Sequence, residues 1–458
     1  MSFRRKIFLG ILFINFILLT GCGTLIVQVE NPQHTPSPEQ STITPTKRAT
    51  SIVVSATDSG ITPTSTTAPV TGGGAGQPTA SAQPGPSLTP GTSIKISFLK
   101  MLDPQNGWSI AQVDTDLFAH ILLTSDGGKS WKDRTPAAPL LEAPADGLDA
   151  VAFFNSTQQA WVIFYSRMPQ VGEPSPVIWR TADGGATWSK SSSLELSGVE
   201  VEFQVPSDLG FLDALHGWVM LHIGAGMMHD YIAVFTTSDG GSTWQKVLDP
   251  TTGQSIMSCQ KSGLAFTTAM NAWLSGNCPG LMPSLFLYRS TDGGLNWEEI
   301  NLPVPEGKPA EYYSQNNVAC GIDRINFATA RSLDLTLTCS DLSNRTALSW
   351  LYSSADGGLT WNDHLLPLPH NDRISLLRTD EGFLVGSAQQ DSNQGGAVYH
   401  MTNNGSGWSL VTLTQWTGQP DFVDNLNGWV IAAHNGESAL VRTTDGGKSW
   451  VVLKPVVE

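Results

Sequence analysis

The sequence of 458 residues predicts an all-β fold, namely a seven-bladed β-propeller of four-stranded antiparallel blades preceded by a disordered tether. Three observations predict this fold. A Ser/Thr-x-Asp/Asn-Gly motif that closes with tryptophan occurs in seven copies, an aromatic residue follows a turn ahead of most copies, and the chain contains 45 glycines and 28 prolines. The copies lie 41 to 64 residues apart, which is the length of one four-stranded blade with its connection.

Residues 1–21 are predicted to be a lipoprotein signal peptide. Three cationic residues, Arg4 to Lys6, precede an apolar run of 13 residues from Ile7 to Leu19, and Leu19-Thr20-Gly21-Cys22 resembles the lipobox of bacterial lipoproteins. That resemblance implies removal of residues 1–21 and lipidation of Cys22, which would anchor the chain to the cell membrane on its extracytoplasmic side. The run is short for a bilayer, so a permanent transmembrane helix is the weaker alternative. An ordinary cleaved signal with an incidental cysteine is the other.

Residues 22–93 are predicted to form the disordered tether. From Asn31 to Ser93 the chain consists mostly of Thr, Ser, Pro, Gly and Ala and contains no aromatic residue. Such a segment cannot bury enough apolar surface to offset the entropy lost on ordering. The tether either gives the following domain reach through a cell wall or serves as a simple spacer, and both alternatives stay open.

The charge balance argues against some partners. The formal net charge is −15 at pH 7, and beyond residue 92 the chain carries 20 Lys and Arg against 37 Asp and Glu. An acidic domain of this kind is unsuited to nucleic acid or to an anionic membrane surface. We therefore expect no nucleic-acid partner.

The motif copies are best explained as structural. The aspartate can accept backbone N–H bonds across a tight turn, and the following glycine allows the positive φ that the turn needs. A side chain that recurs in almost every blade serves the scaffold, whereas an active site occurs once. A seventh copy, Thr402 to Trp408, is one residue short and has Asn404 at the acidic position. The six aspartates are Asp126, Asp183, Asp239, Asp292, Asp356 and Asp445.

An aromatic residue that follows a turn precedes most motif copies, and we call it the landmark aromatic. With the motif it gives each unit the order strand, turn, strand, loop, strand, motif, strand. The fifth unit lacks the landmark and has Ser332-Leu-Asp334 instead. The first and last units each contain a complete set of strands, so ring closure by an exchanged strand is not obvious. The landmark aromatics are Trp108, Trp161, Trp218, Trp273, Phe383 and Trp429. The predicted blades are 94–135, 147–191, 199–248, 256–302, 318–366, 373–414 and 417–456.

The repeated motif resembles the Asp-box, or bacterial neuraminidase (BNR) repeat. Together with the Gly-Trp strand, residues 94–456 most resemble the photosystem II stability and assembly factor group, whose propellers have seven blades. The resemblance implies a propeller domain, residues 94–458, that acts as a binding or assembly scaffold without catalysis of its own. This chain departs from the family pattern in three places. The motif copy at Asn404 is degenerate, the fifth unit lacks the landmark aromatic, and two cysteine pairs are present.

The cysteines predict two local disulfides. If Phe266 faces Ala272 across a turn, the two cysteines that flank this hairpin lie nearly opposite on adjacent strands. The same construction holds in the next unit, and disulfides fit an exported protein. A zinc site of four thiolates is the rival, which the long intervals and separate blades disfavour. The predicted pairs are Cys259 with Cys278 and Cys320 with Cys339.

An exo-acting glycoside hydrolase of the sialidase type is the alternative function. Sialidases share the Asp-box, but they carry a Phe/Tyr-Arg-Ile-Pro motif ahead of the first box, where this chain has no arginine between Arg48 and Arg134. Glu311-Tyr312-Tyr313 could mimic a sialidase Tyr/Glu pair, yet an aromatic surface loop explains it more simply. Xyloglucan-cleaving enzymes with Asp-boxes typically contain two propeller domains, whereas this chain is predicted to contain a single one. We therefore predict no catalytic residue.

A ligand, either a protein or a glycan, is expected on the loops of the face opposite the motifs. Arg324 and Arg331 are interpreted as turn residues. His222, His229 and Asp230 could hold a metal, but surface polar loops seldom do, so no metal and no cofactor are predicted. We expect a monomer. The candidate binding residues are Arg167, His222, His229, Asp230, Tyr231, Tyr312, Tyr313, Arg345 and Trp416.

Overall fold

The computed structural model describes residues 88–137, 139, 144–253, 256–278, 285–327, 329–368, 374–378, 380–387 and 395–458. The predicted signal peptide, Cys22 and most of the predicted tether lie outside the described residues. The chain divides into two units, Met1–Thr42 and Ile43–Glu458, and every described residue belongs to the second. No helix of the described residues has both the length and the apolar character needed to cross a membrane.

The described residues form an all-β fold of antiparallel sheets, with two short 3₁₀ turns at Tyr312–Ser314 and Asn403–Gly405. Most sheets contain one sequence repeat each. The first sheet contains β1 (Lys95–Met101), β2 (Gly107–Gln112), β3 (His120–Thr124), β4 (Ser130–Asp133) and β31 (Val456–Val457). The second contains β5 (Leu148–Phe154), β6 (Ala160–Ser166), β7 (Ile178–Thr181) and β8 (Ser189–Lys190). The third contains β9 (Val205–Pro206), β10 (Gly210–Phe211), β11 (Gly217–Gly226), β12 (His229–Thr237) and β13 (Gln245–Leu248).

The next sheet has nine strands, because two consecutive repeats join where Asn277 of one pairs with Gly321 of the other. Its first repeat contains β14 (Gln260–Phe266), β15 (Ala272–Asn277), β16 (Leu285–Ser290) and β17 (Glu298–Glu299). Its second contains β18 (Val318–Ile322), β19 (Asn326–Phe327), β20 (Leu333–Asp341), β21 (Thr346–Ser354) and β22 (Asn362–Leu365). The last two sheets contain β23 (Ile374–Arg378), β24 (Glu381–Ser387), β25 (Gly396–Thr402) and β26 (Gly407–Thr414), then β27 (Thr417–Phe422), β28 (Gly428–His434), β29 (Glu437–Thr443) and β30 (Val451–Val452).

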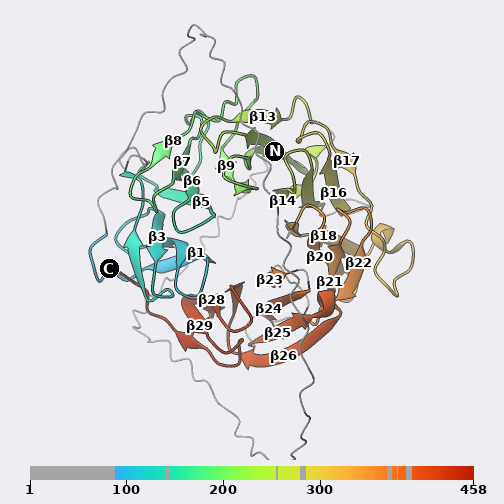
Figure 1. The fold of residues 1–458 in the computed structure, drawn as a ribbon. Helices are drawn as coiled ribbons and strands as arrows, with labels where there is room; N and C mark the ends of the chain where they lie inside the picture. The colour runs from blue at the N-terminus through green and yellow to red at the C-terminus, as the bar shows by residue number, and fades with distance from the viewer. Residues whose placement is uncertain are drawn as a thin grey trace, which may run out of the picture. The chain divides into compact units, whose positions relative to one another are not determined.

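Within the second unit the sheets follow one another in a ring, and the last sheet contacts the first (Figure 1). The indole of Trp429 in β28 donates a hydrogen bond to the carbonyl of Gly127, which follows β3. The backbone N–H of Met101 in β1 donates to the carboxylate of Asp421 in β27 over 2.5 Å. These contacts join the two ends of the repeat array.

The first and last sheets each contain four strands of their own, and the C-terminal strand β31 adds a fifth strand to the first sheet. β31 pairs in parallel with β4, with Val456 opposite Ser130 and Val457 opposite Trp131. Gly91 donates its backbone N–H to the carbonyl of Val457, and Val457 donates its own N–H to the carbonyl of Thr92. Gly91 and Thr92 belong to the segment that was predicted to be the tether. Gly91 and Thr92, which precede the predicted boundary at residue 94, thus have backbone hydrogen-bond partners on the C-terminal strand.

The core lies between the sheets, where the landmark aromatics pack on the first strand of the next repeat. Trp161 stacks on Phe211 with 3.9 Å between ring centroids, and Phe383 stacks on Phe422 at 3.7 Å. The first-strand ring in turn lies over the glycine that precedes the landmark of its own repeat. A Cβ at Gly217 would lie 2.6 Å from the Phe211 ring, closer than side chains can approach.

A candidate ligand-binding cavity on the inner strands

The six motif aspartates lie in turns, where backbone and side-chain donors occupy their oxygens. In every copy the hydroxyl two residues earlier donates to Oδ1, and so does the backbone N–H four residues later. The two glycines after each aspartate have positive φ, for example 79° at Gly127 and 90° at Gly128. The first glycine also donates its N–H to the turn that precedes the landmark, as Gly127 does to the carbonyl of Gln105.

These donors keep the motif carboxylates ionised. The hydroxyl and N–H of Thr360 lower the pKa of Asp356 to about 2. The N–H and side-chain amide of Asn296 likewise lower the pKa of Asp292. The arrangement satisfies donors in a tight turn, which is a structural task. The degenerate copy differs, because Asn403 and Asn404 both have positive φ in a 3₁₀ turn and Thr402 makes no side-chain cap.

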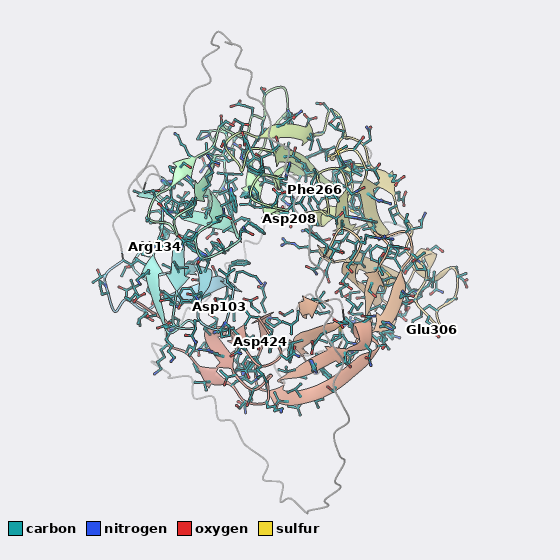
Figure 2. The ribbon with its side chains drawn as sticks, viewed as in Figure 1. Asp103, Arg134, Asp208, Phe266, Glu306 and Asp424 are labelled. Atoms are coloured by element: carbon teal, nitrogen blue, oxygen red, sulfur yellow. A yellow bond between two sulfur atoms is a disulfide. The ribbon has the colours of Figure 1, made fainter. Side chains whose placement is uncertain are left out.

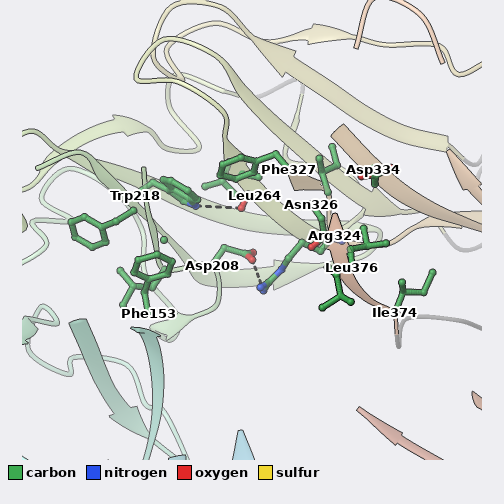
Figure 3. Close-up of a pocket in the computed structure, with 16 residues that line it drawn as sticks. Phe153, Asp208, Trp218, Leu264, Arg324, Asn326, Phe327, Asp334, Ile374 and Leu376 are labelled. Carbon is green, nitrogen blue, oxygen red and sulfur yellow. Dashed lines mark hydrogen bonds and ion pairs between the residues drawn. The ribbon is translucent and has the colours of Figure 1, made fainter. Parts of the chain in front are cut away.

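A cavity of about 420 Å³ opens between the first strands of successive repeats. Figure 3 shows its residues, and Figure 2 shows that Asp208 lies beside the central opening, whereas Arg134 and Glu306 lie toward the outside of the ring. This volume is within the range of small-ligand pockets. Its apolar side chains include Phe153, Phe211, Trp218, Phe327, Ile374 and Leu376, and its polar ones are Asp208, Arg324, Asn326 and Asp334.

An ion pair crosses one side of the cavity. Nη2 of Arg324 lies 2.5 Å from Oδ1 of Asp208, and the Arg324 side chain is 58% exposed while that of Asp208 is 4% exposed. Burial raises the pKa of Asp208, and the charge of Arg324 acts in the opposite direction. The pair joins the β9–β10 connection of the third sheet to the β18–β19 connection two repeats later (Figure 3). Arg324 was interpreted as a turn residue. It lies in the β18–β19 connection, packs its backbone against Gly263 of β14, and lines the cavity.

A second polar network extends from this pair toward the β11–β12 hairpin. His222 Nε2 lies 3.2 Å from the hydroxyl of Ser207, and its Nδ1 lies 2.8 Å from Oδ1 of Asp230. The other oxygen of Asp230 accepts the backbone N–H of Lys261. Burial lowers the pKa of Lys261 to about 8, although its ammonium donates to three carbonyls, those of Asp230, Ser258 and Cys259. Two predicted binding residues, His222 and Asp230, are thereby engaged in a buried network beside the cavity.

A second carboxylate, that of Asp334, also lines the cavity. The residue is 2% exposed, and Oδ1 has no hydrogen-bond partner among the described residues. Burial raises its pKa to about 7. Asp334 is the second residue of β20, the place that an aromatic landmark occupies in the other repeats, so the gap in the pattern at Ser332-Leu-Asp334 was the sequence signal for it.

The remaining predicted binding residues do not gather at one site. Arg167 pairs with Asp149, Tyr231 stacks on His229, and the backbone of Arg345 has a φ of 57° in the β20–β21 turn. The other three aromatics pack inward. Tyr312 is 8% exposed against Trp350, Tyr313 donates its hydroxyl to the carbonyl of Pro303, and Trp416 is 5% exposed against Trp450.

The structure contains both local disulfides. Cys259 bonds to Cys278 and Cys320 bonds to Cys339. The bulge between Lys261 and Gly263 shifts the register of β14 by one residue, which brings the first pair directly opposite each other. Over the described ranges no group of three or more His, Cys, Asp or Glu side chains is arranged to hold a metal ion.

Comparison with known proteins shows similarity to photosystem II assembly factors over part of the chain. The chain is 32% identical over 100 residues to "Photosystem II assembly lipoprotein Ycf48" of Synechococcus sp. (strain CC9902), which is 21% of this chain and 28% of that protein. It is 23% identical over 163 residues to "Photosystem II stability/assembly factor HCF136, chloroplastic" of Arabidopsis thaliana, which is 36% of this chain and 33% of that protein. The match thus spans about a third or less of each relative. No family model matches the chain.

Solved structures with a similar arrangement include enzymes. A GH74 enzyme of Niastella koreensis is 13% identical with a TM-score of 0.30, over 79% of this chain and 66% of that chain. A polysaccharide lyase of family PL25, an ulvan lyase, is 7% identical with a TM-score of 0.45, over 81% of this chain and 97% of that chain. Neither likeness is close enough to inform on function.

Proposed function

We propose that this protein is a lipid-anchored, extracytoplasmic, seven-bladed β-propeller that acts as a non-catalytic binding or assembly scaffold for a membrane-associated partner. The observation that carries the proposal is the similarity of part of the chain to a photosystem II assembly lipoprotein. The name of that relative describes it as a lipoprotein of photosystem II assembly. The partner of this chain is proposed to be a protein, with a surface glycan as the other candidate ligand.

The repeat architecture supports a scaffold. Seven motif copies and the nine-stranded sheet that holds two repeats are consistent with seven blades. The motif carboxylates are occupied by donors of their own turns. Rigid sheets that carry short loops and a central cavity offer a surface for a partner without requiring chemistry.

The proposed anchor is a lipid on Cys22. Its support is the Leu19-Thr20-Gly21-Cys22 sequence behind an apolar run, together with the word lipoprotein in the name of one relative. The two disulfides support an oxidising compartment, because structural disulfides are rare in the cytosol.

Two measurements test the proposal. The full chain and its Cys22→Ser variant are expressed in a bacterium that receives an alkyne-labelled fatty acid. The wild type is expected in the membrane fraction with label, and the variant is expected without label. The full chain is then cross-linked in membranes of its source and its partners are identified. Recovery of a defined membrane protein complex supports the scaffold, whereas release of sugar from surface glycans by the purified chain contradicts it.

A further inference from the structure

We propose that the cavity between the inner strands binds an ammonium or guanidinium group on an apolar stem, such as a lysine or arginine side chain of a partner protein, and that Asp334 is the carboxylate that receives it. The inference rests on the proposed function in one respect, because the cationic side chain is taken to belong to the protein that the scaffold holds. The cavity and its carboxylate are observed independently of that role.

The position of Asp334 in the repeat is the first step of the argument. Asp334 pairs with Asn326 on β19 and with Ser353 on β21, one residue after Leu333 pairs with Ser354. Trp273 holds the same register position in the preceding repeat, opposite Arg289 and next to the pairing of Ala272 with Ser290. A carboxylate thus replaces an indole. The indole is a large apolar ring with one N–H donor, whereas the carboxylate is small and only accepts hydrogen bonds. The smaller side chain frees space, and the carboxylate needs a donor from elsewhere.

The burial of this carboxylate is the second step. Asp334 is 2% exposed, and Oδ1 finds no hydrogen-bond donor in the part of the chain that the structure describes. Desolvation of a carboxylate without a partner is costly, and here it raises the pKa to about 7. A ligand that supplies both positive charge and N–H donors would remove that cost. A neutral ligand or an anion would not.

The lining of the cavity is the third step. Phe327, Leu376 and Ile374 provide an apolar wall suited to the methylene stem of a long cationic side chain. The other charged groups among the described lining residues are Arg324 and Asp208, which neutralise each other in their ion pair. Asp334 therefore carries the unbalanced charge of the cavity, and the net charge of −15 further favours a cationic ligand.

The test uses a matched pair of probes, n-butylamine and 1-butanol, which share a four-carbon stem and differ in charge. Their affinities for the purified full chain are measured by calorimetry and by ligand-observed NMR at pH 8. The amine is expected to bind at least tenfold more tightly than the alcohol. Asp334→Asn, which keeps the shape of the side chain, is expected to abolish that preference. Asp341→Asn, at the other end of the same strand and outside the cavity lining, is expected to keep it.

The pH dependence gives a second readout. Asp334 is ionised above its pKa, so the affinity for n-butylamine is expected to rise about tenfold from pH 6 to pH 8, while that for 1-butanol stays constant. Equal binding of the two probes, or a preference that survives in Asp334→Asn, would overturn the proposal. A thermal unfolding scan of each variant establishes that it is folded.

The partner is tested separately by cross-linking in membranes. Weaker capture by Asp334→Asn than by Asp341→Asn supports a cationic side chain of the partner in the cavity. Equal capture by both variants overturns that assignment and leaves the scaffold function standing. Amine binding without capture of any partner contradicts the proposed function and leaves the cation site standing.

Discussion

The indole Nε1 of Trp429 donates a hydrogen bond of 2.9 Å to the carbonyl oxygen of Gly127, a residue 302 positions earlier in the chain. The indole is fully buried, and the guanidinium of Arg442 lies over its ring, 4.9 Å from the centroid. One side chain thus connects the last sheet to the first motif turn. The acceptor is a backbone carbonyl, so a side-chain substitution at Gly127 does not remove it. The hydrogen bond is therefore tested by changing Trp429.

We expect Trp429→Phe to lower the free energy of unfolding by about 2 to 4 kcal/mol, because it leaves the Gly127 carbonyl without its donor and also removes packed atoms. Urea unfolding followed by circular dichroism measures the loss. The matched control is Trp361→Phe, which removes an indole whose Nε1 has no hydrogen-bond partner among the described residues. An equal loss in both variants would mean that the bond to Gly127 contributes nothing measurable.

Removal of one disulfide, in the double variant Cys259→Ala with Cys278→Ala, is expected to lower the free energy of unfolding by about 3 kcal/mol. The sequence separation is 19 residues for this bond and for the Cys320–Cys339 bond, so the unfolded chain gains similar freedom in either case. The second double variant, at Cys320 and Cys339, should therefore lose a similar amount. Urea unfolding with and without dithiothreitol checks the prediction, which fails if reduction leaves the wild-type midpoint unchanged.

Arg324→Ala is expected to destabilise the fold by about 2 to 4 kcal/mol at pH 7, because it leaves the buried carboxylate of Asp208 without its counterion. The loss should shrink as the pH falls, since protonation removes the uncompensated charge. Arg331→Ala, in an exposed turn, serves as the control and should have little effect. Thermal unfolding at several pH values measures both. A loss at Arg324 that does not change with pH would contradict the role of Asp208.

Acid should destabilise the fold in part through Asp249. Burial raises the pKa of this carboxyl, but the ammonium of Lys246 and the hydroxyl and N–H of Thr251 outweigh that effect and lower the pKa to about 2. A lowered pKa contributes stability above the unfolded value of 3.8, and the contribution is lost as the pH falls toward 2. The contribution is about 1 to 2 kcal/mol.

The measurement is the urea midpoint between pH 5 and pH 2. Asp249→Asn is expected to flatten the acid limb of that curve, and Lys246→Met is expected to flatten it partly, because it removes a donor 2.8 Å from Oδ2. Acid limbs of equal slope in the wild type and both variants would show that Asp249 does not titrate differently on folding.

The repeat itself was readable in the sequence because its determinants are local. The turn at Asp126 depends on donors within four residues, and the positive φ at Gly127 is encoded by the glycine. The disulfide between Cys259 and Cys278 followed from the register of one hairpin. Such features need only neighbouring residues.

The cavity was harder to foresee because its determinants are distant in sequence. The contact of Arg324 with Asp208 joins two loop connections that lie two repeats apart, and no local pattern in the chain marks either residue as the partner of the other. The pairing of Val457 with Trp131 depends on the short C-terminal segment, which carries no motif and has no pattern of its own. Asp334 did leave a trace, as the missing aromatic of its repeat, but only the fold showed that the residue is buried.

Strand β31 has a consequence for biosynthesis. It is the final strand of the chain, yet it lies along β4 in the first sheet, where Val457 covers the indole of Trp131. The earliest sheet to leave the ribosome therefore presents a bare strand edge and an incompletely covered core until nearly all later residues have been made. Open edges and uncovered apolar surface promote aggregation, so the first sheet carries this hazard until β31 has been made and has paired with β4.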